Sequence, residues 1–429
     1  MSSQRLLASR HSTTQQHVVT SGRPHAVLIS GAVLMALLLM LSGCHRTRSA
    51  QAVTDGDTIP LRYAQNLTMV RFSDGILVEL KDPWHEGRIL HRYWLTEDSN
   101  NLPGPQGRLQ GQAEHNPSTI LSPLSSLHSP LSILHSPLSS IKFPLQRSVV
   151  FNTAHASLIG MLNATDRIAG VADLKYMLLP DVQRRVQQGE IVDCGNSMSP
   201  DIEQIVSLHA DAILLSPFEN SGGYGRLEKL GIPIIECADY METSPLGRAE
   251  WMRFYGLLFG CSQQADSLCS MVEHAYCALR DSVSTSAPLK ILTERLTGST
   301  WYVPGGKSTM GRLIADAGAT YAWADDDHSG SLALSFETVL SKSGNADVWL
   351  MNTSSPQPFT YESLAAEHHG YTQFKAFRDR NIYFINTLQV PYFEEVSFRP
   401  DLLLRDYITM LHPNPQHPPL RYFQKMHSQ

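Results

Sequence analysis

The sequence lacks the patterns that metal cages and nucleic-acid surfaces require. Its six cysteines include no Cys-x-x-Cys pair, which argues against a zinc or iron–sulfur cage. The formal net charge is -6, the pI is near 6.3 and no basic stripe is present, so the electrostatic footprint of a nucleic-acid-binding protein is missing. Setting Cys44 aside leaves five cysteines, an odd number that allows at most two disulfides.

Catalytic motifs are missing as well. No Gly-x-Ser-x-Gly elbow occurs in the chain. The run Gly305-Gly306-Lys307-Ser308 is not a P-loop, because Trp301 stands where that motif needs its first glycine. His85-Glu86 has no second histidine at the spacing of a zinc protease helix. These segments are typical of turns and polar surface.

The first 50 residues have the features of a targeting segment. Three arginines and no acidic residue precede an apolar run over 26–41, which is shorter than the roughly 20 residues of a bilayer span. The run fits the apolar region of a secretory signal. It ends in Leu41-Ser42-Gly43-Cys44, which resembles a bacterial lipobox, in which the cysteine carries the lipid. The alternatives are a plain signal peptide or a short membrane anchor.

Residues 122–142 form a low-complexity repeat. SPLSSLH, SPLSILH and SPLSSIK follow one another, and a proline in every copy excludes a coiled coil. We expect an exposed insertion, extended or disordered, that carries no site. The preceding segment, 69–95, predicts two or three short strands, the first two separated by the turn Asp74-Gly75.

From Arg147 onward, short apolar strand patterns alternate with helical ones. This rhythm predicts a parallel sheet in an α/β lobe, and it restarts near residue 285. Within the first lobe we expect a helix over 200–208 with Ser199 as its N-cap.

Between the two lobes, Ala265–Val283 contains neither glycine nor proline and predicts a helix roughly 28 Å long. Its apolar face comprises Leu268, Met271, Val272, Ala275, Tyr276, Leu279 and Val283. Periodicity alone leaves two interpretations, a strut between lobes or an ordinary surface helix. The matching lobe patterns on either side favour the strut.

The region from Arg147 to His412 resembles the substrate-binding proteins of bacterial ABC importers, in the class with a rigid helical backbone that includes vitamin B12 and ferric-siderophore receptors. The resemblance rests on the order of SPDIEQIVSLHADAILLSP, GRAEWMRFYGLLFG with the long helix, GSTWYVPGGKSTMGRLIADAGATYAWAD, LSFETVLSKSGNADVWLMN and RPDLLLRDYITMLHP. It implies an α/β fold of two lobes with parallel-sheet cores, one long rigid interdomain helix and a ligand cleft between the lobes. The repeat insertion and the longer N-terminal flank depart from the family, and we expect neither to touch the lobes.

The resulting domain plan has eight parts. They are a lipoprotein signal peptide (1–43), a tether (44–58), a β-rich flank (59–100), the Ser/Pro/Leu repeat insertion (101–146), the N-terminal lobe (147–246), the linking segment (247–284), the C-terminal lobe (285–412) and a tail (413–429).

The resemblance implies a receptor rather than an enzyme, with no covalent cofactor and no nucleic-acid partner. The expected ligand is an iron chelate (ferric siderophore or ferric citrate), haem or a corrinoid of the cobalamin type, delivered to an ABC permease dimer with its ATPase. The lipid on Cys44 would hold the protein in the cell envelope, on the periplasmic or extracytoplasmic face of the membrane. The alternatives are a receptor for bare zinc or manganese, a secreted lipoprotein hydrolase and a structural surface lipoprotein.

Candidate ligand residues are those on the loops that follow the strands, since ligands bind outside the carboxyl ends of such sheets. They are Thr153, His155, Asp173, Lys175, Tyr176, Asn196, Phe218, Tyr224, Tyr240, Arg295, Trp301, Tyr302, His328 and Tyr392. Trp301 and Tyr302 suit a macrocycle or aryl ring, and Arg295 suits an anionic chelate. A bare-metal site would draw on His155, His328 and the pair His368-His369, whose spacing shows no convergence.

Two glutamates occupy matching places in the two lobes. Glu203 and Glu337 each lie in the first turn of a predicted helix. The resemblance implies that each docks into an arginine pocket of one permease subunit. The alternative is that each acid is favoured there only by the helix dipole.

Overall fold

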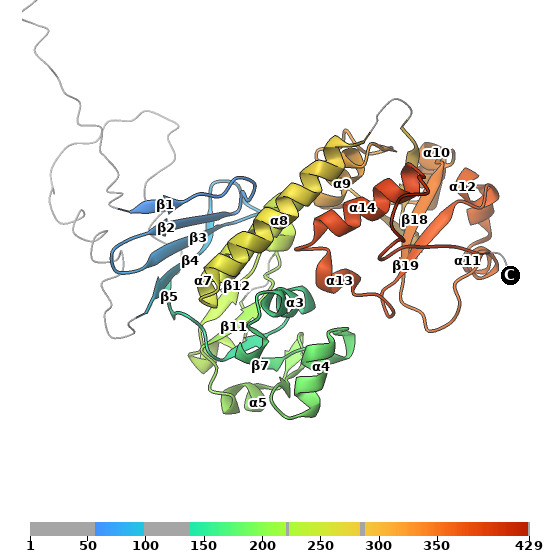
Figure 1. Ribbon diagram of the computed structural model, residues 1–429. Helices are drawn as coiled ribbons and strands as arrows, with labels where there is room; N and C mark the ends of the chain where they lie inside the picture. Colours follow the sequence, from blue (N-terminus) through green and yellow to red (C-terminus); the bar gives the residue numbers. More distant parts are fainter. Residues whose placement is uncertain (1–55, 98–137, 220–222, 284–287, 428–429) are drawn as a thin grey trace, which may run out of the picture. The chain divides into compact units, whose positions relative to one another are not determined.

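Figure 1 shows the computed structural model, which describes residues 56–97, 138–219, 223–283 and 288–427. The described residues belong to one unit, Asp55–Gln429. The predicted signal peptide, Cys44 and most of the repeat lie outside the described residues.

The N-terminal lobe is built on a five-stranded sheet that is parallel throughout, in the order β12-β11-β6-β7-β8. Its strands are β6 (Ser148–Val150), β7 (Ile168–Val171), β8 (Val192–Asp193), β11 (Ala212–Leu215) and β12 (Ile234–Glu236), and its helices are α3 (Thr153–Met161), α4 (Pro180–Gln187) and α5 (Ile202–Ser207). β6, β7 and β11 are fully buried, as the short apolar runs predict. The chain leaves β6 toward β7 on one side and returns to β11 on the other. This reversal opens a crevice at the carboxyl ends of β6 and β11.

The C-terminal lobe repeats the plan with the sheet order β16-β13-β18-β19-β20, in which only the β19–β20 pair is antiparallel. The strands are β13 (Lys290–Thr293), β16 (Thr320–Tyr321), β18 (Val348–Thr353), β19 (Ile382–Asn386) and β20 (Gln424–Lys425), and a smaller sheet holds β14 (Leu296–Thr297), β15 (Thr300–Pro304) and β17 (Ser331–Leu334). The helices are α9 (Thr309–Asp316), α10 (Phe336–Ser343), α11 (Tyr361–Glu367), α12 (Lys375–Arg378), α13 (Tyr392–Glu395) and α14 (Pro400–Leu411). Two α/β lobes with parallel-sheet cores are therefore confirmed.

Two local expectations differ from the structure. Asp201, not Ser199, caps α5, because its side chain accepts the Gln204 amide, while Ser199 lies in β10 (Ser199–Pro200), which pairs with β9 (Gly195–Asn196). The segment after His412 is not a loose tail. It adds β20 to the sheet, and the buried Asp406 carboxylate accepts the backbone amides of Arg421 and Tyr422.

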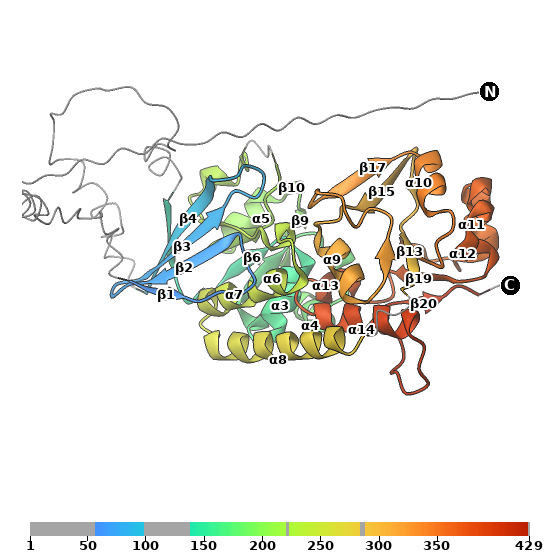
Figure 2. The same cartoon turned by 90° about the horizontal axis from the view of Figure 1, so that it is seen from above.

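The long helix is α8 (Ser262–Asp281), 20 residues or roughly 30 Å. Figure 2 shows it running past the N-terminal lobe and along α14 of the C-terminal lobe. Its Tyr276 hydroxyl donates to Asp316 of α9, 2.9 Å away. Contact with elements of both lobes supports the strut interpretation.

The buried stripe of α8 differs from the predicted face. Its fully buried residues are Ala265, Cys269, Val272 and Tyr276, whereas Met271 is 43% exposed. The reason is the close packing of α8 on α7 (Met252–Leu258). A Cβ on Gly256 of α7 would lie 2.5 Å from the Ala265 Cβ. The small side chains at these two positions therefore allow the two helices to pack closely on that side of α8.

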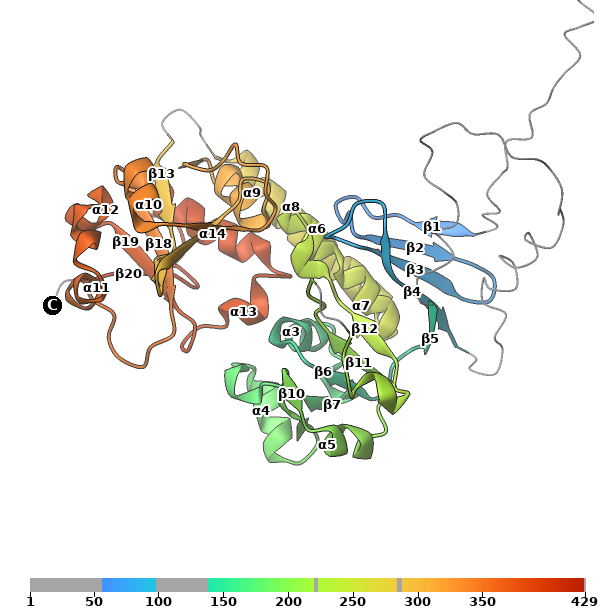
Figure 3. The same ribbon diagram turned by 180° about the vertical axis from the view of Figure 1, so that it is seen from behind.

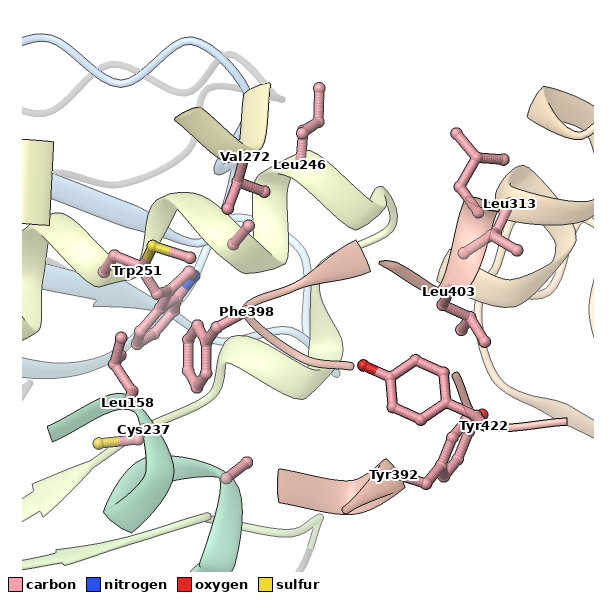
Figure 4. Close-up of a cluster of buried hydrophobic side chains, with 14 of the residues drawn as sticks. Leu158, Cys237, Leu246, Trp251, Val272, Leu313, Tyr392, Phe398, Leu403 and Tyr422 are labelled. Carbon is pink, nitrogen blue, oxygen red and sulfur yellow. The ribbon is translucent and has the colours of Figure 1, made fainter. Parts of the chain in front are cut away.

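A single buried core continues from the N-terminal lobe through α7 into the C-terminal lobe. Phe398, which follows α13, is fully buried, and its ring lies 5.9 Å from that of Tyr255 in α7. Figure 4 shows Phe398 beside Trp251 and near Leu158 of α3. Glu394 of α13 adds a polar bridge between the lobes, since its Oε1 accepts the Leu178 amide at 2.9 Å.

The flank folds into a third sheet, β1-β2-β3-β4-β5, in which only the β4–β5 pair is parallel. Its strands are β1 (Asp57–Ile59), β2 (Leu67–Arg71), β3 (Ile76–Lys81), β4 (Ile89–Thr96) and β5 (Leu138–Lys142). β5 comes from the last copy of the repeat, and its Ile141 is fully buried. That part of the repeat is therefore a strand of the sheet rather than an exposed insertion, because its apolar side chain enters the core.

The expectation that the flank does not touch the lobes is wrong. Two buried carboxylates, Glu242 of the N-terminal lobe and Glu250 of the linking segment, hold five successive backbone amides of residues 62–66. Glu250 of α6 (Pro245–Glu250) accepts those of 62, 63 and 64, and Glu242 accepts those of 65 and 66. Figure 3 shows the sheet beside α6 and α7. The two glutamates supply partners for the amides of this partly buried loop.

Replacing Glu250 by alanine tests this attachment. Three partly buried amides would lose their acceptor, and we expect the free energy of unfolding to fall by about 3 kcal/mol. Denaturant unfolding measures the change. Glu190→Ala, which removes an exposed partner of Arg185, is the matched control and should cost less than about 0.5 kcal/mol. Equal small losses in the two variants would contradict the attachment.

Candidate functional site

A pocket of about 910 Å³ lies between the two lobes. This volume is in the range of sites for cofactor-sized ligands. The N-terminal lobe contributes the loops after β6 and β11, and the C-terminal lobe contributes Met310 and the α13 region. The lining residues are Phe151, Asn152, Thr153, Ala154, Asp173, Tyr176, Met177, Ser197, Met198, Ser199, Pro200, Ile202, Leu215, Ser216, Phe218, Gly223, Tyr224, Gly225, Arg226, Leu227, Arg248, Met310, Tyr392, Phe393, Val396 and Ser397.

Asn152 fixes the floor of the pocket at the crevice between β6 and β11. Its Oδ1 accepts the Ala154 amide at 2.8 Å and so caps α3, and its Nδ2 donates to the Ser216 hydroxyl at 3.1 Å. The Asn152 side chain thus connects the loop after β6 to the loop after β11, at the place where the strand order reverses.

The pocket wall is rich in exposed apolar side chains. Eight large apolar side chains are exposed among the described residues, and four of them line this pocket. They are Tyr176, Met198, Phe218 and Phe393. Exposed apolar surface that gathers in one concave place indicates a ligand with apolar or aromatic faces.

Charged groups are few in the lining, which includes only Asp173, Arg226 and Arg248. Asp173 accepts hydrogen bonds from the amide and the hydroxyl of Ser197. Arg248 donates its Nε to Asp239 Oδ2 at 3.1 Å. Asp239 Oδ1 lies 2.9 Å from His155 Nε2, and both of these residues are buried.

The environment of Asp239 alters its acidity. Burial by itself would raise the pKa of this carboxyl, but the charges and hydrogen bonds of His155 and Arg248 outweigh burial and hold the pKa below its usual value. Asp239 is therefore ionised when it holds Arg248 at the pocket.

Tyr224 connects the pocket to the N-terminal sheet. Its hydroxyl donates to Glu236 Oε1 at 2.7 Å, and Glu236 Oε2 lies 3.1 Å from His91 Nδ1 in β4. The Tyr93 hydroxyl of the same strand accepts the Glu236 amide at 2.9 Å. One buried glutamate, Glu236, thus contacts both a pocket-lining side chain and the N-terminal sheet of strands β1–β5, called the added sheet below.

Six of the fourteen candidate ligand residues line the pocket: Thr153, Asp173, Tyr176, Phe218, Tyr224 and Tyr392. Four other candidates of the N-terminal lobe do not. His155 is buried against Asp239, Lys175 lies over the Tyr176 ring, Asn196 accepts the Met198 amide, and Tyr240 donates to the Pro217 carbonyl.

The four remaining candidates, all in the C-terminal lobe, lie outside the lining. Trp301 is fully buried, stacks on Trp349 and donates to the Thr293 carbonyl. Arg295 follows β13 as expected, but it pairs with Glu367 and donates to the Asn352 carbonyl. Tyr302, on the other face of β15, and His328, bonded to Asp326, are exposed but do not line the pocket.

Sequence reasoning missed Arg248, Arg226, Met198 and Met310. Arg248 lies in the linking segment and Met310 in α9, away from the loops after strands where ligand residues were expected. Arg226 and Met198 do lie in such loops, after β11 and β9. The linking segment joins the two lobes, so a cation near its start, such as Arg248, is a signal for a residue that faces the pocket.

Metal-ligand side chains do not converge in the described part of the chain, where no group of three or more His, Cys, Asp or Glu residues could hold an ion. His368 and His369 stack on each other, 5.5 Å between ring centroids. The five cysteines from Cys194 to Cys277 are free.

Glu203 and Glu337 are exposed in the first turns of α5 and α10. In Figure 2 these two helices lie on the opposite side from α8. Ile202, the neighbour of Glu203, lines the pocket, so Glu203 lies near its rim. Within the described ranges, no helix is both long and apolar enough to cross a bilayer.

Comparison with known proteins gives three findings. The family model described as periplasmic binding protein matches residues 149–387. An uncharacterized lipoprotein of Methanocaldococcus jannaschii is 23% identical over 279 residues, 63% of this chain and 66% of its own length, so the chain spans just under two thirds of that relative.

Two solved structures are similar with a TM-score of 0.50 each. One is an ABC-type Fe3+-hydroxamate transport system from Saccharomonospora viridis, 18% identical, with 62% of this chain and 92% of that chain covered. The other is an ABC transporter substrate-binding protein from Listeria monocytogenes, 16% identical, with 63% and 100% covered. At these identities the similarity establishes the fold alone.

Asp239→Asn tests the buried ionised carboxylate beneath the pocket. Because the pKa of Asp239 is lowered in the folded state, its ionisation stabilises the protein above its usual value near 3.8, and this contribution disappears as the pH falls through the lowered pKa. We expect the variant to be less stable than the wild type at neutral pH, and the difference to shrink below about pH 4.

Denaturant unfolding at several pH values measures this difference. Asp281→Asn, at an exposed carboxyl of α8, serves as the control. A stability gap for Asp239→Asn that is the same at every pH would contradict the assignment.

Proposed function

Because the chain belongs to the periplasmic binding protein family, we propose that it is the substrate-binding receptor of an ABC importer. The observation that carries the proposal is the pocket between the lobes, with exposed aromatic side chains on both of its sides. A receptor needs such a site to capture a ligand and release it unchanged.

The ligand that we propose is an iron chelate, haem or a corrinoid. A pocket of about 910 Å³ with Tyr176, Phe218 and Phe393 on its wall suits a ring-bearing molecule of that size. The absence of a converging set of metal ligands among the described residues speaks against a bare zinc or manganese ion. The Fe3+-hydroxamate transport system among the similar structures is consistent with this class.

We also propose that capture involves little closure of the lobes. The lobes share a buried core at Phe398 and are bridged by Glu394 and by the 20-residue helix α8. Hinge bending would have to expose the core and break these contacts, which costs free energy that a ligand must supply.

Attachment to the membrane by a lipid on Cys44 completes the proposal. The lipobox-like sequence before Cys44 and the lipoprotein name of the relative support it. The protein would then act on the periplasmic or extracytoplasmic face of the membrane, where the permease dimer receives the ligand.

A ligand panel tests the receptor function. Ferric hydroxamate, ferric catecholate, ferric citrate, haem and cobalamin are added to the protein, and tryptophan fluorescence and the melting temperature are recorded. We expect at least one of them to quench the fluorescence and raise the melting temperature. Phe218→Ala and Phe393→Ala should each weaken that ligand about tenfold, because each loses an aromatic face in the pocket.

Tyr302→Ala is the matched control for the panel, since Tyr302 is equally exposed but lies outside the pocket. It should leave the affinity unchanged. Absence of any response in the wild type would remove the receptor proposal, and turnover of ester or phosphoester substrates by the same preparation would favour a hydrolase.

The two exposed glutamates are proposed to dock on the permease. A Glu203→Ala/Glu337→Ala double variant should bind ligand like the wild type and abolish uptake in cells that carry the cognate permease and ATPase, because each lobe loses its steering charge. Glu190→Ala/Glu362→Ala, with one exposed glutamate in each lobe, controls for a general loss of surface charge. Normal uptake in the first double variant would disprove docking through these residues.

A further inference from the structure

Arg248 is the pocket-lining cation that the structure holds most firmly. It lies in the last turn of α6, its side chain is 24% exposed, and it lines the pocket between the lobes. Arg226, the other lining cation, lies in an exposed turn.

The hydrogen bonds of Arg248 leave part of its guanidinium available. Only Nε has a partner within the described part of the chain, Asp239 Oδ2 at 3.1 Å. An arginine has five N–H donors in a planar fork, so four donors on the two terminal nitrogens remain for another group. Such a fork matches two oxygens of a carboxylate or a similar oxyanion.

Asp239 and His155 set the direction of that fork. Asp239 is 1% exposed and binds Arg248 through one oxygen and His155 through the other, 2.9 Å from Nε2. His155 is also 1% exposed and belongs to α3, whose N-cap Asn152 lines the pocket. The guanidinium is therefore oriented by a buried pair fixed to the body of the N-terminal lobe.

The acidic groups near the pocket already have partners. Asp173, the one carboxylate in the lining, accepts two hydrogen bonds from Ser197. Glu394, just below, accepts the Leu178 amide at 2.9 Å and the Thr153 hydroxyl at 3.3 Å. The ionised Asp239 offsets part of the charge of Arg248, so the preference for an oxyanion rests on the free donors of its guanidinium, and Arg226 is a second cation in the lining.

We infer that the ligand is an oxyanion-bearing ring compound, an anionic iron chelate or a macrocycle with carboxylate side chains, and that Arg248 binds its oxyanion. Asp239 and His155 are positioning residues for Arg248. The inference rests on the proposed receptor function and assigns to Arg248 the anion-binding role that the sequence suggested for Arg295.

Two matched pairs of probes test the charge requirement. Ferric protoporphyrin IX is compared with its dimethyl ester, and a trianionic ferric tris-catecholate is compared with an uncharged ferric tris-hydroxamate. Dissociation constants come from quenching of tryptophan fluorescence. We expect the wild type to bind the anionic member of at least one pair more tightly than the uncharged member.

The variants separate Arg248 from general charge effects. Arg248→Gln should weaken the anionic probe on the order of tenfold to a hundredfold and leave the uncharged probe within about threefold. Asp239→Asn should give a smaller loss with the same selectivity, since Arg248 remains but is less firmly oriented. Arg280→Gln, at an exposed arginine of α8 outside the pocket, should bind like the wild type.

The outcomes distinguish the two levels of the proposal. If the wild type binds both members of each pair equally, or if Arg248→Gln weakens both equally, the anion inference is wrong while the receptor function stands. If no probe binds to the wild type, both are wrong. Should Arg248→Gln fail to fold, Arg248→Lys decides: it keeps the charge but lacks the fork, and an unchanged preference for the anionic probe would overturn the role of the guanidinium.

Discussion

The buried contact between the two lobes is the constraint on which the rest of the structure depends. Phe398 joins the ring cluster of α7, and Glu394 supplies an acceptor for a backbone amide of the opposite lobe. The pocket lies directly above this contact, because Thr153 and Tyr392 line the pocket while their neighbours form the core. The distance between the walls of the pocket in this structure is thus set by the packing of apolar side chains. Interiors packed in this way have discrete arrangements and resist gradual deformation.

The added sheet is part of the same body. Its attachment combines apolar burial with charge. Val78 and Ile141 belong to the same buried cluster as Trp251, and Glu242 and Glu250 hold successive amides of the loop that leads into β2. Trp251 also donates to Glu242, so the anchor for the sheet and the ring cluster between the lobes share a carboxylate. The strands of this sheet all precede residues 149–387, which the family model matches.

Local sequence patterns were sufficient to predict the architecture and to place six of the candidate residues in the pocket lining. The absence of glycine and proline identified α8, and residues that follow β6, β7 and β11 were expected at the ligand site for a topological reason. The failures share one physical cause, which is dependence on partners far away in the sequence. Arg295 lies after the carboxyl end of β13, as expected, but its guanidinium forms a salt bridge with Glu367. Trp301 is buried because its ring stacks on Trp349 of β18 in the core. Arg248 reaches the pocket only through the path of the folded linking segment.

The position of Glu236 has a thermodynamic consequence. One of its oxygens accepts the hydroxyl of Tyr224 at the pocket, and the other pairs with His91 of the added sheet. A change at Tyr224 in the pocket and the attachment of the sheet through His91 share this carboxylate. The two equilibria are therefore thermodynamically linked, and such linkage is reciprocal. A ligand that tightens the hold of Tyr224 on Glu236 also changes the free energy with which the sheet is held, by the same amount that the sheet changes the affinity for the ligand.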